Sequence, residues 1–167
     1  IYDFFGKTFY AYQYDVKAIK SIIARILKYL YDEEMLDLSG ENIYATKFGK
    51  RASELYIDPV SAVVIRDALR HKPFYLTDLS LLHLIAHTPD MGPIMRPYAR
   101  ELDEMAVLME EHKDEFFTEA PNEWEDHIAY EEFLGEIKTA VVLKSWIEET
   151  SEDTLIERFR VQPGDLY

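Results

Sequence analysis

Residues 43–59 constrain the fold most, because they combine a strand signal with two helix starts in one short stretch. Thr46 follows a β-prone run and can cap an amphipathic helix. Asp58 and Pro59 then start a second helix, since proline lacks only an N–H that is unpaired at the first helical position anyway. The stretch therefore predicts a boundary between a small α/β unit and a helical region.

The sequence before this boundary has the pattern of helices joined to a hairpin. Asp15 precedes a segment whose isoleucine and leucine residues recur at spacings of three and four, as in an amphipathic helix. Two short β-prone runs flank a turn that contains Gly40, which is typical of a β-hairpin. Helices followed by a hairpin and a further helix predict a winged-helix domain over residues 1–57, with residues 35–45 as the wing.

Residues 3–14 are rich in phenylalanine and tyrosine. Such rings can stack on nucleic-acid bases, but packing into a core is their commoner use. We therefore expect these side chains to pack within the N-terminal domain.

The second half of the sequence predicts helices throughout. Thr77 precedes a segment at 79–87 that is apolar on most sides, so this helix must be buried among others. Further helices are expected at 101–117, within 124–149 and after Ser151. Residues 58–167 therefore predict an all-helical bundle that is incomplete at its C-terminal end. The expected fold class is mainly α, a winged helix followed by this bundle.

Acidic charge is concentrated in one part of the chain. The net charge at pH 7 is −14, and residues 101–157 carry 3 Lys and Arg residues against 19 Asp and Glu residues. This block has a helical pattern, so we interpret it as the solvated face of the bundle. Residues 1–100 are nearly neutral, and the net charge alone does not exclude nucleic-acid binding there.

Catalytic and metal-binding motifs are not found in the sequence. His83 and His87 have the i, i+4 spacing of metal ligands, but Leu84 occupies the position where a zinc protease requires glutamate. We therefore predict two core or interface histidines and no metal site. The sequence also lacks a Gly-x-x-x-x-Gly-Lys phosphate loop and a Gly-x-Ser-x-Gly elbow.

The cysteine count and the apolar runs indicate where such a chain resides. It has no cysteine, which excludes disulfides and thiolate metal sites. No apolar run approaches the roughly 20 residues of a membrane span. We expect a cytoplasmic protein without membrane contact.

Residues 133–147 carry the candidate binding site. If they form a helix, one stripe of that helix has small side chains along its length and a tryptophan at its end. The stripe consists of Gly135, Thr139, Val142 and Trp146, with Lys138 beside it. Such a stripe can let a nucleic-acid strand lie close and stack a base on the indole. The alternative is that Trp146 is an ordinary core residue.

Several motifs occur in the order that is typical of one helicase family. They are Thr8-Phe9-Tyr10-Ala11-Tyr12-Gln13, Ala45-Thr46-Lys47-Phe48-Gly49-Lys50, Leu55-Tyr56-Ile57-Asp58-Pro59-Val60-Ser61-Ala62, Leu82-His83-Leu84-Ile85, Thr88-Pro89-Asp90-Met91, Lys138-Thr139-Ala140 and Pro163-Gly164-Asp165-Leu166. Through these motifs the chain resembles, nearly end to end, the archaeal Hjm family of Ski-like superfamily 2 DNA helicases.

The resemblance implies a segment of an ATP-dependent helicase that translocates 3′ to 5′ and unwinds forked DNA at stalled replication forks. Residues 1–57 would be its winged helix and residues 58–167 most of its helical ratchet domain. ATP and Mg²⁺ would bind motor domains elsewhere in the enzyme, so we expect neither a catalytic site nor a cofactor here. The expected partners are single-stranded or forked DNA and the motor domains in cis, in a monomeric enzyme.

The resemblance also implies that the helix at 133–147 touches the translocating strand. Trp146 matches an aromatic position expected to stack on a base, and Thr139 lies two turns earlier, where the family can have a basic residue. The predicted DNA-binding residues are Trp146, Thr139, Lys138 and Val142. The alternative function is a protein-interaction module without direct DNA contact, in which aromatic side chains near residues 4–14 and the acidic block recruit a partner.

Overall fold

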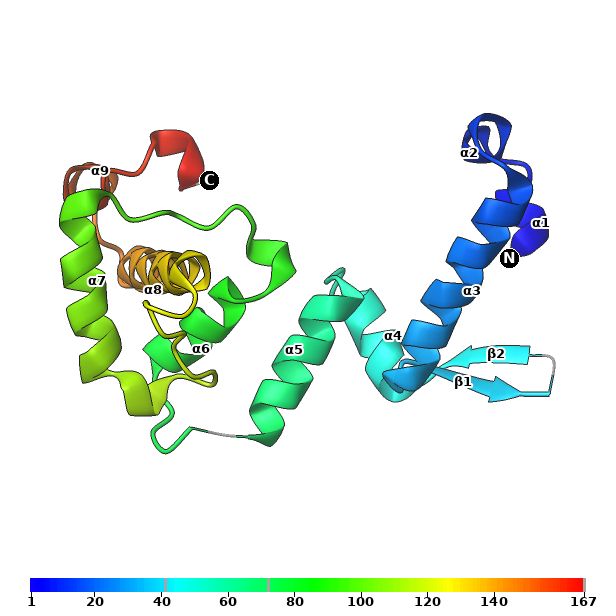
Figure 1. Cartoon of the computed structure of the whole chain (residues 1–167), viewed down its shortest axis with the longest axis horizontal. Helices are drawn as coiled ribbons and strands as arrows, with labels where there is room; N and C mark the ends of the chain where they lie inside the picture. Colours follow the sequence, from blue (N-terminus) through cyan, green and yellow to red (C-terminus); the bar gives the residue numbers. More distant parts are fainter. Residues whose placement is uncertain (41, 72, 167) are drawn as a thin grey trace. The chain divides into compact units, whose positions relative to one another are not determined.

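The structure is a computed structural model that describes residues 1–40, 42–71 and 73–166 (Figure 1). Within these residues the chain is mainly helical and has one two-stranded antiparallel sheet. It divides into two compact units, Ile1–Pro59 and Val60–Tyr167. The fold class predicted from the sequence, a winged helix followed by an all-helical bundle, is confirmed.

The first unit joins short helices to the hairpin. Its elements are α1 (Tyr2–Phe5), α2 (Phe9–Gln13), α3 (Val16–Asp32), β1 (Leu36–Ser39), β2 (Asn42–Ala45) and α4 (Lys47–Glu54). The Asp15 carboxylate caps α3 by accepting a hydrogen bond from the Lys17 amide at 3.2 Å. In the hairpin Leu36 faces Ala45, and Gly40 has a φ of +62° in the turn. The hairpin therefore forms where the sequence predicts the wing.

The start of α4 is hydrogen-bonded to the loop that follows α3. The Thr46 hydroxyl donates to the Glu34 carbonyl at 2.7 Å, and the Thr46 amide donates to the Met35 carbonyl at 3.0 Å. The same hydroxyl caps α4 by accepting from the Gly49 amide at 3.1 Å. A Cβ at Gly49 would overlap the Met35 carbonyl oxygen and lie 2.8 Å from its carbon. Only glycine lets the helix approach this backbone so closely.

The aromatic side chains at the start of the chain are exposed, so the prediction that they pack into a core was wrong. Neither α1 nor α2 contains a buried residue. Phe9 and Tyr12 are 73% and 87% exposed, and their rings lie 6.2 Å apart. Helices of four and five residues present too little surface to bury so many large rings, even where α1 contacts α3.

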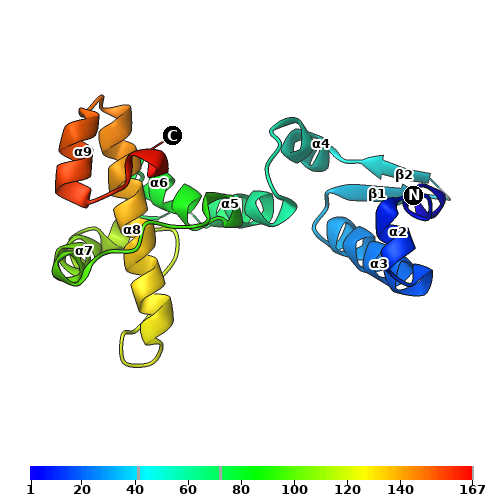
Figure 2. The same ribbon diagram turned by 90° about the horizontal axis from the view of Figure 1, so that it is seen from above.

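The second unit is a bundle built around one long helix. Its elements are α5 (Pro59–Arg70), α6 (Asp78–Ala86), η1 (Pro89–Met91), α7 (Ala99–Glu111), η2 (Lys113–Glu115), α8 (His127–Ile147), α9 (Glu152–Phe159) and η3 (Pro163–Asp165). Figure 1 looks along α8 with α6, α7 and α9 around it, and Figure 2 shows α8 along its length. Of the helices in the described residues, none is long and apolar enough to cross a membrane.

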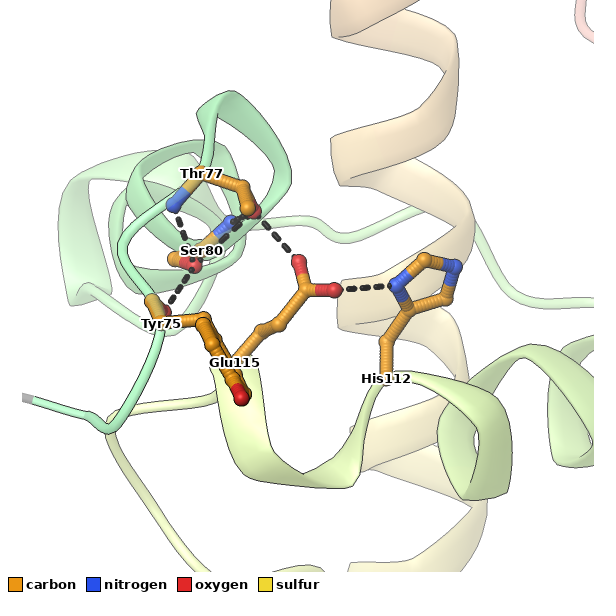
Figure 3. Close-up of polar contacts among 5 residues, drawn as sticks. All are labelled: Tyr75, Thr77, Ser80, His112 and Glu115. Atoms are coloured by element: carbon orange, nitrogen blue, oxygen red, sulfur yellow. Dashed lines mark hydrogen bonds and ion pairs between the residues drawn. The ribbon is translucent and has the colours of Figure 1, made fainter.

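The link between α6 and the end of α7 differs from the sequence prediction. The helix expected over 101–117 stops at Glu111 and continues only as the short η2. At this turn Glu115 points back to α6, where its carboxylate accepts a hydrogen bond from the Thr77 hydroxyl at 2.5 Å (Figure 3). The Glu115 carboxylate also pairs with His112 Nδ1 at 2.7 Å. These contacts require the chain to turn, because a continued helix would carry Glu115 away from Thr77.

The electrostatics of Glu115 agree with this linking role. Burial raises the pKa of its carboxyl, but hydrogen bonds from Thr77 and His112 outweigh burial, so the pKa lies below its ordinary value. Thr77 and Ser80 form the reciprocal capping box of α6, and Ser80 Oγ also donates to the Tyr75 carbonyl at 3.4 Å (Figure 3). The charged Glu115 carboxylate thus links η2 to the capped start of α6 through a hydrogen bond.

Candidate nucleic-acid interface

Helix α8, which carries all the predicted DNA-binding residues, is the core element of the bundle. It begins at Asp126, whose carboxylate accepts a hydrogen bond from the Ala129 amide at 3.0 Å. Its middle is buried on every side, as expected of a helix surrounded by others. The buried residues are Phe133, Leu134, Gly135, Ile137, Lys138, Thr139, Ala140 and Val142.

The small stripe of α8 is covered by the chain's own backbone. A Cβ at Gly135 would lie 2.9 Å from Ile94 Cδ1 and 3.5 Å from the Met95 carbonyl oxygen. The Thr139 hydroxyl accepts a hydrogen bond from the Met95 amide at 2.9 Å and donates to the Gly135 carbonyl at 2.8 Å. Residues 94 and 95, in the segment between η1 and α7, therefore lie against this stripe.

Lys138 is also engaged inside the bundle. Its side chain is 3% exposed, and Nζ lies 2.9 Å from Glu101 Oε2. Nζ also donates to the Arg96 carbonyl at 3.4 Å and lies 5.1 Å from the centre of the Tyr98 ring. This ammonium neutralises a buried carboxylate and holds the segment that crosses α8, and it is not at an accessible surface.

Trp146 differs from the other three predicted residues. Val142, one turn earlier, is buried in a cluster with Leu155, Phe159 and Val161. Trp146 is 39% exposed at the C-terminal end of the helix. Of the predicted residues, Trp146 thus keeps an exposed surface, whereas Thr139, Lys138 and Val142 are buried.

A cationic groove beside α8 was missed from the sequence. It has a volume of about 730 Å³, and its polar lining includes Arg96, Tyr98, Lys138 and Arg160. Arg96 and Arg160 are both exposed. The sequence signal is weak but present, because residues 91–100 contain two arginines and no acidic residue. The 64 positions between Arg96 and Arg160 conceal that they share a groove.

His83 is a core residue next to the more exposed His87. Its ring packs against those of Phe116 and Phe133, with centroids 4.5 and 4.6 Å away. Nε2 is 3.5 Å from Glu136 Oε2 and has no hydrogen-bond partner among the described residues. In residues 1–40, 42–71 and 73–166 no three His, Cys, Asp or Glu side chains are grouped so as to hold a metal ion.

The two histidines have opposite electrostatic environments. Burial, and to a smaller extent the nearby charge of His87, lowers the pKa of His83 to about 3. A hydrogen bond from His87 Nδ1 to Glu136, 3.0 Å long, outweighs burial and raises the pKa of His87. His83 is therefore neutral in the folded protein near neutral pH, whereas protonation of His87 is favoured.

We expect His83 to make the chain sensitive to acid. Between pH 6.5 and 3 the unfolded state binds a proton at His83 and the folded state does not, so stability falls as the pH is lowered. The slope from this group is at most about 1.4 kcal/mol per pH unit. His87 has the opposite effect, because its raised pKa means that the folded state binds the proton more tightly. Its stabilisation of the folded state is complete below pH 6.5 and is lost as the pH rises through the raised pKa.

Urea unfolding of the parent and of His83→Leu at pH 7 and pH 4.5 measures this effect. On going from pH 7 to pH 4.5, the free energy of unfolding should fall by about 2–3 kcal/mol less in the variant than in the parent, because leucine binds no proton in the unfolded state. Equal losses in the two proteins would show that His83 is not the group responsible.

Comparison with known proteins places the bundle in a family. Residues 79–167, more than half of the chain, match the family described as archaeal helicase, domain 4. The chain is 37% identical over 172 residues to the ATP-dependent DNA helicase Hel308 of Pyrococcus horikoshii, with 100% of this chain and 23% of that protein covered. Two further Hel308 relatives, from Methanocella arvoryzae and Thermococcus kodakarensis, are 34% and 35% identical over 98% and 99% of the chain.

These relatives are much longer than the chain, which spans 22% of the Methanocella protein and 15% of the Thermococcus protein. The match nevertheless runs through both compact units, since it covers the chain nearly from end to end. The chain belongs to the archaeal Hel308-type superfamily 2 helicase family, as a segment that contains its domain 4.

Proposed function

We propose that this chain is a non-catalytic, DNA-guiding segment of an ATP-dependent 3′ to 5′ DNA helicase that acts on forked DNA in replication-fork repair. Support comes from relatives named ATP-dependent DNA helicase, which match the chain over its whole length. In this proposal residues 1–57 are the winged-helix domain and residues 58–167 most of the ratchet domain. ATP and Mg²⁺ bind motor domains in the rest of a monomeric, cytoplasmic enzyme.

The observation that carries the proposal is the exposure of Trp146 at the end of a helix that is otherwise fixed in the core. A ring on such a rigid support can stack on a base without losing much conformational freedom. Direct DNA contact by Lys138, Thr139 and Val142 stays a prediction, and their burial supports a role in holding α8. The motor domains would supply most phosphate contacts, because the bundle is acidic.

Tryptophan fluorescence tests the proposed contact directly. The chain has two tryptophans, and Trp124 is 91% exposed, so Trp124→Phe leaves Trp146 as the sole indole at little structural cost. Adding oligo(dT) of about 20 nucleotides at low salt should quench Trp146 emission, because a stacked base deactivates the indole. Weak affinity is expected at physiological salt, given the net charge of −14.

Anisotropy of labelled oligo(dT) provides the control for this titration. If anisotropy shows binding while Trp146 emission is unchanged, Trp146 does not contact the strand. In the reciprocal variant, Trp146→Phe, the remaining Trp124 should report no quenching.

The exposed aromatic residues of the first unit favour a second candidate function. Phe4, Phe9 and Tyr12 are each more than two-thirds exposed on α1 and α2. A protein-interaction module would use such a surface to bind a partner. This alternative predicts that substitutions on α8 leave DNA binding unchanged, so the fluorescence titration separates the two functions.

A further inference from the structure

We propose that the groove lined by Arg96, Tyr98 and Arg160 binds a phosphodiester of single-stranded DNA, as a second strand contact in addition to that of Trp146. This inference rests on the proposed function, because it extends the path of the guided strand. It adds a phosphate-binding element to a domain whose proposed strand contact is made by Trp146.

The two arginines line one groove, whereas several other cations of the bundle are used internally or in surface pairs. Lys113 and Lys138 lie 2.5 and 2.9 Å from carboxylate oxygens, and Lys144 lies 4.0 Å from one. Among the residues that the structure describes, Arg96 and Arg160 form no ion pair. Both therefore keep their guanidinium groups available in a domain that is otherwise strongly acidic.

The chemistry of the groove fits a nucleotide. A guanidinium group presents a planar fork of donors that matches phosphate oxygens. The Tyr98 ring is 52% exposed and lies in the same lining, where it can stack on the adjoining base. Ile94, Met95 and Val161 supply an apolar wall for the sugar and the base edge. The combination of free arginines and one ring favours a nucleotide strand over an acidic peptide.

The groove is held in shape by residues that the sequence placed in the DNA contact. Lys138 binds the Arg96 carbonyl, and Thr139 binds the amide of Met95, so α8 fixes the backbone on both sides of the Met95–Arg96 peptide. Across the groove, Arg160 ends α9 with a φ of +52°, and its amide donates to the Ile156 carbonyl at 2.9 Å. Lys138 and Thr139 are in this view positioning residues.

Binding of fluorescein-labelled oligo(dT) to the 167-residue chain, followed by anisotropy at low salt, tests the proposal. The double variant Arg96→Ala with Arg160→Gly should bind at least tenfold more weakly. The slope of log K against log salt should fall by about 1.4, since each phosphate contact on a single strand contributes about 0.7. Lys113→Ala is the matched control, because it removes an exposed charge that is already paired.

The choice of glycine at position 160 separates binding from folding. Residue 160 is in the left-handed conformation, which glycine adopts more easily than arginine. Arg160→Gly should therefore have a thermal midpoint no lower than the parent while it weakens DNA binding. A lowered midpoint together with weakened binding would assign a structural role to Arg160 and contradict the proposal.

The outcomes distinguish this inference from the proposed function. If oligo(dT) quenches Trp146 and the double variant binds like Lys113→Ala, the groove is not a phosphate site while the proposed function stands. If the double variant loses affinity and Trp146 is not quenched, the groove is supported as a phosphate site and the proposed strand contact of Trp146 is contradicted. The groove proposal is overturned if the parent chain binds no oligo(dT). It is also overturned if polyglutamate displaces the labelled oligo(dT) at a lower concentration than unlabelled oligo(dT) does.

Discussion

Replacing Gly49 by alanine is expected to destabilise the winged-helix unit by about 3 kcal/mol or more. The new methyl group would overlap the Met35 carbonyl, and the three nearest atoms are all Met35 backbone atoms, which cannot swing aside as a flexible side chain can. The helix would have to move away, which would stretch the bonds from Thr46 to Glu34 and Met35. In an unobstructed helix, replacing glycine by alanine would raise the free energy of unfolding by about 1 kcal/mol. The sign of the measured change therefore shows whether the close approach to Met35 is present.

Hydrogen exchange with mass spectrometry locates this effect. Peptides that cover β1 and α4 should lose protection in Gly49→Ala, whereas peptides from α8 should exchange as in the parent. Gly164→Ala is the matched control, since a Cβ at Gly164 meets no atom within 4 Å. Unchanged protection of α4 in Gly49→Ala would mean that the helix does not approach Met35 as described.

The second large effect is expected from Lys138→Leu, which should lower the free energy of unfolding by about 3–5 kcal/mol. The substitution leaves the Glu101 carboxylate, which is 13% exposed, without its ammonium partner. It also removes the donor that holds the Arg96 carbonyl. Urea unfolding followed by circular dichroism measures the loss.

A second substitution separates buried charge from lost packing. Lys138→Leu combined with Glu101→Gln should recover a large part of the stability, because a neutral amide needs no counter-charge. Lys113→Leu, which breaks an exposed pair with Glu110, should change the free energy of unfolding by less than about 1 kcal/mol. A loss at Lys138 as small as that at Lys113 would contradict the buried ion pair.

Helix starts could be predicted from the sequence because their causes are local. Asp15, Thr46, Thr77 and Ser151 each accept a hydrogen bond from an amide two or three residues ahead, as their side-chain types indicate. The hairpin likewise follows from neighbouring residues and a turn that contains Gly40. These signals were sufficient for the fold class.

What covers each face of a helix could not be predicted, because it depends on residues far away in the chain. The stripe at Gly135 and Thr139 was identified from its spacing, but the covering segment comes from about 40 positions earlier. Lys138 was identified from its place beside this stripe, and its partner Glu101 lies 37 positions away. The aromatic residues at 3–14 gave the opposite error, since their composition suggested a core and the structure exposes them.

The central claim is that Trp146, at the exposed end of a buried helix, guides the DNA strand. Its most direct measurement is unwinding of forked DNA by the whole helicase carrying Trp146→Ala, beside the control Trp124→Ala, whose indole is also exposed. Stacking on one base is worth about 1–3 kcal/mol, so the unwinding rate should fall roughly tenfold in Trp146→Ala while ATP hydrolysis without DNA is kept. Unwinding by Trp146→Ala at the rate of Trp124→Ala would contradict the claim.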